Sequence, residues 1–148
     1  MARTAADIMH TDFPFVDCDV TVAEAEECFE QNGLTALPVL NPDRTLFGVL
    51  TPQNLIQFYR RPLNNPRASH AWEICDARPL TAAATSPLSE IAGALLESSR
   101  SHALIVNDEN QLVGMVSTDQ LLEENLLVAG REKPVMAART AAPEPKSR

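Results

Sequence analysis

Two short segments of the sequence carry a hydroxyl residue followed three residues later by a side-chain amide. Thr51 precedes Asn54 in the first segment, and Ser117 precedes Gln120 in the second. In both, a glycine and two apolar residues come before the hydroxyl, which predicts the end of a strand and then a helix N-cap. Free backbone amides and the positive end of a helix dipole attract anions, and the amide one turn further could bond a ribose diol. Both segments therefore predict contacts with a phosphorylated ribose.

The same four residues also have a simpler interpretation. Threonine and serine are common N-cap residues, and capping stabilises a helix by about 1 kcal/mol, so Thr51 and Ser117 need no ligand to explain them. Asn54 and Gln120 would then be ordinary polar residues in a first helical turn. The sequence leaves both interpretations open.

The two segments belong to an internal repeat of the chain. The sequence aligns with itself without a gap at an offset of 66 residues, the separation of Gly48 and Gly114. Chemical type is kept at many aligned positions, for example at Val39 and Ile105. The identical pairs are Ile8/Ile74, Glu24/Glu90, Asn41/Asn107, Leu46/Leu112, Gly48/Gly114 and Leu55/Leu121.

Each copy predicts a short extended piece, a helix, two apolar strands and a second helix. In the first copy these elements are the extended piece 15–16, a helix that opens at the capping box of Thr21 and Glu24, strands 37–40 and 46–50, and a helix from Thr51 and Pro52. In the second copy they are 80–82, a helix with Ser86 as N-cap and Pro87 as first residue, strands 103–106 and 112–116, and a helix from Ser117. The capping box and the proline at the first helical position are the local signals used. The predicted fold is α/β (α+β), built of two βαββα units.

A segment without regular structure separates the copies. Residues 59–70 contain two prolines and a pair of asparagines, which interrupt helices and strands. We therefore assign the first unit to 4–58, the linker to 59–70 and the second unit to 71–126, and expect 127–148 to form a disordered tail. A unit of about 50–60 residues is marginal for an independent core, so the two units are expected to pack together.

The overall charge and hydropathy disfavour a nucleic-acid-binding protein, a membrane protein and an exported protein. Twenty acidic against 12 basic residues give a net charge of −8, which disfavours nucleic acid as a partner. No apolar stretch approaches the about 20 residues that span a bilayer, and Asp7 stands where an export signal would be apolar. We expect a cytoplasmic protein with no membrane partner.

The reactive residue types form no catalytic or metal-binding pattern. The three cysteines include no CxxC pair, and the histidines do not show metal-ligand spacing with them. No nucleophile-plus-base motif and no glycine-rich phosphate loop is present. We therefore expect no metal site and no enzymatic activity.

Taken together, the repeated motifs resemble the CBS domain pair, also called the Bateman module. The resemblance covers about residues 4–126 and is carried by one set of segments that recurs at a single offset. These segments are 8–9, 21–25, 33–40 and 48–55 in the first copy, and 86–92, 102–108 and 114–121 in the second.

This resemblance implies two βαββα repeats related by a pseudo-two-fold axis, with two clefts between them. It also implies that two chains form a flat, disc-like homodimer. Members of the family bind adenine-containing ligands such as AMP, ADP, ATP or S-adenosylmethionine, and regulate a partner rather than catalyse. The expected function is therefore to sense an adenine ligand in the inter-repeat cleft, without a required cofactor, and to signal to a separate regulated protein.

The chain departs from the family pattern at two positions. Where Asn54 and Gln120 stand, the family most often has an aspartate that accepts hydrogen bonds from both ribose hydroxyls. Each amide offers one acceptor oxygen and no charge. Ribose capture is expected to be weaker as a result.

The resemblance adds two site residues in the second copy. His102 stands just before strand 103–106, where nucleotide-sensing members carry a phosphate-contacting histidine, although a lone histidine is more often a surface or packing residue. The extended piece around Thr81 would contact the adenine edge through its backbone. On this basis the preferred site is the cleft with Ser117, Gln120 and His102.

Two other functions stay open. The absent aspartates would suit a ligand-independent dimerisation or scaffold module with degenerate nucleotide sites, and a third hypothesis is a separated regulatory piece of a transporter or ion channel. A ligand that binds only the native state raises the melting temperature. A panel of adenine ligands would therefore separate the sensor from the scaffold.

Overall fold

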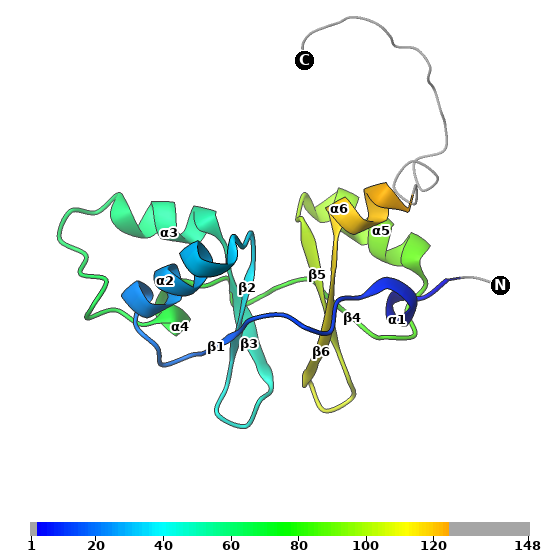
Figure 1. The fold of residues 1–148 in the computed structure, drawn as a ribbon, viewed down its shortest axis with the longest axis horizontal. Helices are drawn as coiled ribbons and strands as arrows, with labels where there is room; N and C mark the ends of the chain where they lie inside the picture. The colour runs from blue at the N-terminus through cyan, green and yellow to red at the C-terminus, as the bar shows by residue number, and fades with distance from the viewer. Residues whose placement is uncertain (1–2, 125–148) are drawn as a thin grey trace, which may run out of the picture.

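Two small sheets face each other at the centre of the molecule, and the helices lie outside them (Figure 1). The structure is a computed structural model and describes residues 3–124. The predicted tail at 127–148 lies outside the described residues. Among residues 3–124, no helix has the length and apolar composition needed to cross a bilayer.

Both sheets have the same topology. The first contains β1 (Val16–Asp17), β2 (Leu37–Leu40) and β3 (Leu46–Leu50), and the second contains β4 (Thr81–Ala82), β5 (His102–Val106) and β6 (Leu112–Ser117). In each, the first strand is parallel to the second and the third is antiparallel to it. The α+β fold of two tandem repeats predicted from the sequence is confirmed.

The helices within residues 3–124 follow the same duplication. They are α1 (Ala5–Ile8), α2 (Val22–Asn32), α3 (Pro52–Tyr59), α4 (Ala71–Ile74), α5 (Leu88–Ser98) and α6 (Thr118–Glu123). The capping box predicted for α2 is present, because Thr21 Oγ1 accepts from the Glu24 amide at 3.1 Å and Glu24 Oε1 accepts from the Thr21 amide at 2.9 Å. The short helices α1 and α4, of four residues each, are too short for the apolar periodicity that predicts the other helices.

The predicted start of α5 is wrong by one residue. Pro87, with φ −63° and ψ 140°, is the N-cap rather than the first helical residue, and the helix begins at Leu88. The Ser86 hydroxyl instead accepts a hydrogen bond from the Ala83 amide at 3.1 Å. The side chain that was expected to cap the helix therefore closes the preceding turn.

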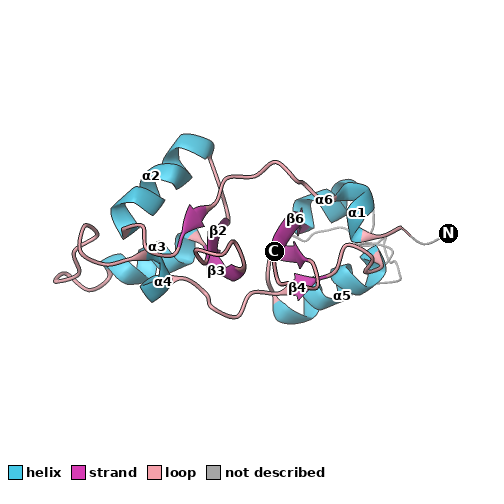
Figure 2. Cartoon of the chain, turned by 90° about the horizontal axis from the view of Figure 1, so that it is seen from below, coloured by secondary structure: helices cyan, strands magenta, loops and turns pink. Residues whose placement is uncertain are grey.

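The segment that leads into each repeat packs on the other repeat. Ala5 of α1 is fully buried in the core of the second repeat, and Ala71 of α4 is fully buried in that of the first. Each segment then pairs with the sheet it has reached, through bridges between His10 and Met115 and between Asp76 and Val49. The two connections lie on opposite sides of the sheets (Figure 2). The repeats thus exchange segments, and each completes the core of the other.

A third apolar cluster joins the inner faces of the two sheets. Ala36, Leu40, Leu46 and Val49 of the first repeat are buried with Leu104 of the second. Strands covered on both faces read as continuous apolar runs, which explains why 37–40 has no polar position. The predicted packing of one unit on the other is therefore seen directly.

Candidate functional site

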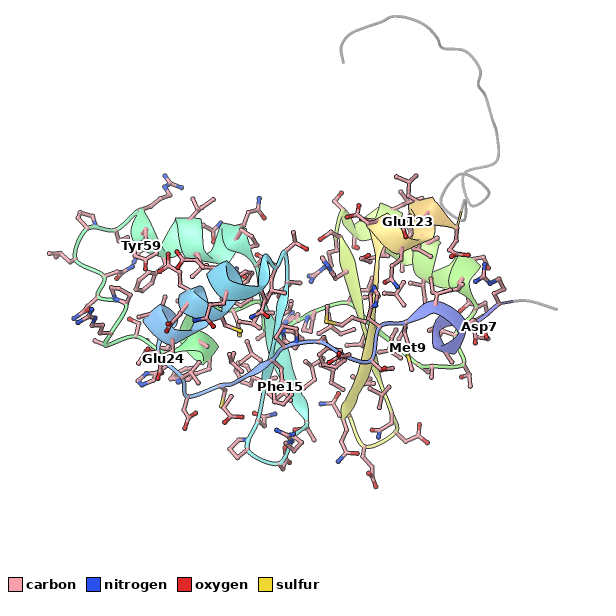
Figure 3. The ribbon with its side chains drawn as sticks, viewed as in Figure 1. Asp7, Met9, Phe15, Glu24, Tyr59 and Glu123 are labelled. Atoms are coloured by element: carbon pink, nitrogen blue, oxygen red, sulfur yellow. The ribbon has the colours of Figure 1, made fainter. Side chains whose placement is uncertain are left out.

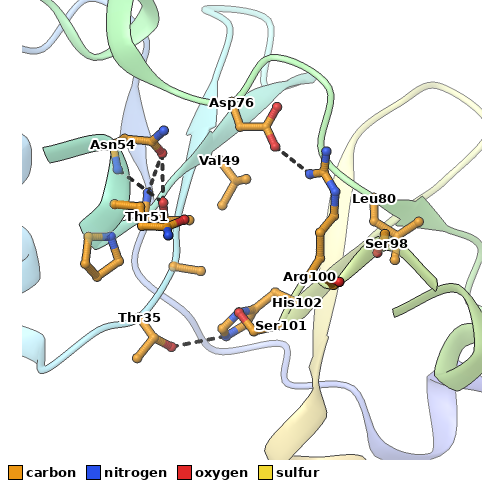
Figure 4. A pocket seen from close by; sticks show the side chains of 14 residues that line it. Thr35, Val49, Thr51, Asn54, Asp76, Leu80, Ser98, Arg100, Ser101 and His102 are labelled. Atoms are coloured by element: carbon orange, nitrogen blue, oxygen red, sulfur yellow. Dashed lines mark hydrogen bonds and ion pairs between the residues drawn. The ribbon is translucent and has the colours of Figure 1, made fainter. Parts of the chain in front are cut away.

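A pocket of about 700 Å³ lies between the repeats, where the start of α3 faces the residues that lead into β5 (Figure 4). Its volume is in the range typical of small-molecule sites. Both repeats and the segment before β4 contribute to its wall. The lining residues are Thr35, Ala36, Val49, Thr51, Pro52, Gln53, Asn54, Asp76, Leu80, Ser98, Ser99, Arg100, Ser101 and His102.

Thr51 and Asn54 hold the start of α3 at one wall of the pocket. Asn54 Oδ1 accepts from the Thr51 amide at 2.8 Å, and Thr51 Oγ1 accepts from the Asn54 amide at 3.4 Å. The side-chain oxygen of Asn54 is therefore used within the cap. Its amide nitrogen has no hydrogen-bond partner among the described residues and remains available to a ligand.

His102, the first residue of β5, connects the two repeats. Its Nε2 lies 3.3 Å from Thr35 Oγ1 of the first repeat, and its Nδ1 lies 2.9 Å from Ser101 Oγ. Burial lowers the pKa of His102 below its ordinary value, and the nearby charge of Asp119 offsets part of this effect. The imidazole at this wall is therefore neutral at pH 7.

An ion pair between Asp76 and Arg100 forms another part of the wall. Arg100 Nη1 lies 2.5 Å from Asp76 Oδ2. Asp76 is tied to the first repeat because its amide and carbonyl both bond Val49 of β3, at 2.8 and 3.0 Å, while Arg100 follows α5 in the second repeat. The pair therefore links the repeats across the pocket.

Sequence reasoning missed both residues of this pair. The repeat offset aligns Asp76 with His10 and Arg100 with Leu34. A carboxylate and a guanidinium that the first copy lacks at these positions are the sequence signal that could have drawn attention to them. Their distance along the chain hid the contact. Nothing in the pattern of the sequence shows that these two positions meet.

The structure separates the residues of the site preferred from the sequence. His102 lines the pocket with Thr51 and Asn54, whereas Ser117 and Gln120 are not among its lining residues. Ser117 caps α6, since its Oγ accepts from the Gln120 amide at 3.1 Å, and Gln120 Nε2 donates to the carbonyl of Ile8 at 2.7 Å. Gln120 thus holds the exchanged segment of α1 in place, Ser117 caps α6, and a ligand role for either residue stays a prediction.

Thr81 lies in a separate, smaller pocket. This cavity of about 180 Å³ is lined by β4, by Ser86, by part of α5 and by Ala103. The neighbouring residue Leu80 lines both cavities. Backbone contact of Thr81 with an adenine therefore stays a prediction as well.

A family model, a curated protein and several solved structures are similar to this chain over most of its length. The family model of the CBS domain matches residues 5–61 and 71–126. A homoserine O-acetyltransferase from Methanosphaerula palustris is 28% identical over 116 residues, which are 78% of this chain. The chain spans only 22% of the length of that relative.

Two solved structures of CBS proteins superpose on most of the chain. CBSX2 in complex with AMP has a TM-score of 0.75 and 20% identity, covering 86% of this chain and 98% of its own. The CBS domain pair of protein MJ0100, in complex with 5′-methylthioadenosine and S-adenosyl-L-methionine, has a TM-score of 0.73 and 17% identity, covering 89% and 100%. With two family matches in tandem and the duplicated, segment-exchanged fold, the chain belongs to the CBS domain family and contains a pair of these domains.

Proposed function

We propose that the chain is a regulatory module that binds an adenosine-containing ligand between its repeats and passes the state of occupancy to another protein. The observation that carries the proposal is the pocket in which the start of α3 meets Arg100 and His102 of the other repeat. A ligand held there touches both repeats, so its binding favours one relative arrangement of them. Complexes of similar CBS proteins with AMP, 5′-methylthioadenosine and S-adenosyl-L-methionine support adenosine as the common part of the ligand.

Within this pocket, each polar group has a proposed role. The Asn54 amide nitrogen donates to a ribose hydroxyl, and Thr51 with the first amides of α3 attracts an anionic or polar group. His102 bonds the ligand as a neutral imidazole. Ser117 and Gln120 stand at the positions equivalent to Thr51 and Asn54 in the other repeat, and the proposal treats them as a second, weaker site.

The module is proposed to regulate rather than catalyse, because CBS domain pairs generally do so. The acetyltransferase activity of the Methanosphaerula palustris relative is not transferred, since this chain matches 22% of that protein. We also propose that the chain acts as a homodimer and signals to a separate protein. Light scattering on the purified protein tests the dimer, because one chain has a mass of 16.2 kDa.

The binding test is calorimetry together with thermal shift, using AMP, ADP, ATP, NAD and S-adenosylmethionine. At 100 times its Kd, a ligand specific for the native state adds about 2.7 kcal/mol to the free energy of unfolding, so at least one should raise the melting temperature clearly. Asn54→Ala should weaken that ligand several-fold. Gln120→Ala removes the equivalent side-chain amide of the other repeat, which does not line this pocket, so comparing the two variants assigns the ligand to one repeat position or the other.

The outcomes separate the alternatives. Loss of binding in Gln120→Ala with no effect of Asn54→Ala would move the ligand to the equivalent position of the other repeat, beside Ser117 and Gln120. No binding of any ligand in the panel would favour the scaffold function. One observation supports the scaffold function. The side-chain oxygens of Asn54 and Gln120 already accept hydrogen bonds from the backbone amides of Thr51 and Ser117, at 2.8 and 2.9 Å, and are therefore engaged within the helix caps.

A further inference from the structure

The positive and negative charges of the side chains that line the pocket cancel. Among its lining residues, the ionisable side chains are Asp76, Arg100 and His102. Burial lowers the pKa of His102, so at pH 7 the wall carries one negative and one positive charge. A phosphate dianion would bring two negative charges into this neutral set, directly beside a carboxylate.

Both members of the ion pair keep bonding capacity on the pocket side. Their side chains are 36% and 33% exposed, so a ligand can reach them. Arg100 uses Nη1 for Asp76, and among the described residues its other guanidinium nitrogens have no hydrogen-bond partner. The Asp76 carboxylate is oriented by the Arg78 amide, which donates to Oδ1 at 2.9 Å. A partly exposed ion pair contributes little to the stability of the fold, so the fold does not by itself explain why Asp76 and Arg100 are paired here.

We propose that the ligand of this pocket is an adenosyl compound with a zwitterionic tail, whose ammonium group pairs with Asp76 and whose carboxylate pairs with Arg100. The inference rests on the proposed adenosine-binding function and names the ligand class of that same site. A zwitterion adds one charge of each sign, so every charge in the occupied pocket has an opposite partner. A carboxylate on a guanidinium forms one of the stronger charge-assisted hydrogen bonds in proteins.

The arrangement of the pocket fits a ligand with two different ends. Figure 4 shows Thr51 and Asn54 on one side of the pocket and Arg100 on the opposite side. An adenosyl group at the start of α3 would therefore extend its tail toward the ion pair.

The Asp76–Arg100 ion pair has no counterpart at the equivalent positions of the repeat. At the repeat offset of 66 residues, His10 is equivalent to Asp76 and Leu34 is equivalent to Arg100. These residues cannot form a carboxylate–guanidinium pair. The inference therefore predicts one zwitterionic ligand per chain.

The test compares three adenosyl compounds by calorimetry at pH 7.5. S-adenosylhomocysteine carries the zwitterionic tail, 5′-methylthioadenosine has the same thioether adenosyl group without it, and AMP has a phosphate instead. The wild-type protein should bind S-adenosylhomocysteine at least about tenfold more tightly than 5′-methylthioadenosine, as expected for one or two charge-assisted bonds, with one site per chain.

Two near-isosteric variants and two control variants test whether Asp76 and Arg100 cause the preference for S-adenosylhomocysteine. Asp76→Asn and Arg100→Gln should each remove most of the preference while changing the affinity for 5′-methylthioadenosine less than about twofold. Asp76→Asn should also bind AMP more tightly than the wild type, because a carboxylate next to the phosphate is gone. Arg3→Gln and Glu124→Gln disrupt an exposed ion pair outside the pocket and should leave all three affinities unchanged.

The results distinguish this inference from the function on which it rests. Binding of 5′-methylthioadenosine or AMP as tightly as S-adenosylhomocysteine would overturn the zwitterion while leaving the adenosine site intact. A preference that survives in both pocket variants would overturn the roles of Asp76 and Arg100. If none of the three compounds binds, the proposed function and this inference are both wrong.

Discussion

His102 illustrates how one side chain can serve the fold and the proposed site together. Its Nε2 lies 3.3 Å from Thr35 Oγ1, and its Nδ1 lies 2.9 Å from Ser101 Oγ. These hydroxyls can satisfy a neutral imidazole, whichever nitrogen carries the proton, because each can donate or accept. The same hydroxyls could accept from a charged ring, so it is burial, which lowers the pKa of His102, that favours the neutral ring at this wall of the pocket.

The burial of His102 predicts a defined dependence of stability on pH. Its folded-state pKa is lowered below 6.5, so the unfolded state binds a proton more readily than the folded state. The associated stability is complete above pH 6.5 and is lost as the pH falls from there through the folded-state pKa. Urea unfolding at pH 7.5 and 5.5 should show a larger loss for the wild type than for His102→Gln, which cannot titrate. An equal loss in the two proteins would contradict the buried, neutral histidine.

At the scale of the elements, two glycines mark where the exchanged segments cross the sheets. A Cβ on Gly48 of β3 would collide with the backbone carbonyl of Asp76, and a Cβ on Gly114 of β6 would lie 2.5 Å from Met9 Sδ. Figure 3 shows Met9 beside β6 on the segment that follows α1. The identical pair Gly48/Gly114 therefore reflects the same close approach in both repeats.

The two crossings should respond differently to an added methyl group. Gly48→Ala is expected to destabilise by about 1–3 kcal/mol, as overpacking usually does, because a hydrogen-bonded backbone cannot move aside. Gly114→Ala should cost less, since the obstacle is the flexible end of a methionine. Gly93→Ala is the control, because nothing lies within 4 Å of its Cβ position on α5, and it should stabilise by about 0.5–1 kcal/mol. Urea denaturation measures all three, and a cost at Gly93 equal to that at Gly48 would contradict this account.

At the scale of the whole molecule, the exchange of α1 and α4 makes the repeats dependent on each other. Neither core is complete without a segment that belongs to the other repeat in the sequence. The cluster around Leu104 adds a shared interface between the sheets. We therefore expect the two repeats to unfold as one cooperative unit.

A core substitution at this interface tests the cooperativity. Leu104 is 1% exposed, and Leu104→Ala should cost about 2–5 kcal/mol. Trp72, the single tryptophan, lies on α4 against the first repeat, so its fluorescence reports a repeat different from the one mutated. Fluorescence and far-ultraviolet circular dichroism should shift together in urea. Leu63→Ala, at a side chain 97% exposed, should change neither, and separate transitions in Leu104→Ala would show that the repeats unfold independently.

Features that depend on local pattern could be predicted from the order of the residues alone. Apolar runs gave strands β2 and β3 at their observed bounds, and the capping box at Thr21 gave the start of α2. The repeat offset gave the duplication, because both copies repeat the same alternation of strands and helices. The error at Ser86 is also local, since one hydroxyl had two neighbouring amides to accept from and the sequence does not rank them.

The contacts between residues of the two copies became visible in the folded molecule and could not be predicted from local pattern. His102 contacts Thr35, 67 residues earlier, and Arg100 pairs with Asp76, 24 residues earlier. Both contacts follow from the exchange of segments and the packing of one sheet on the other, which local propensity does not encode. The candidate pocket therefore combines Thr51, Asn54 and His102, which the sequence singled out, with an ion pair that becomes visible when the repeats are brought together.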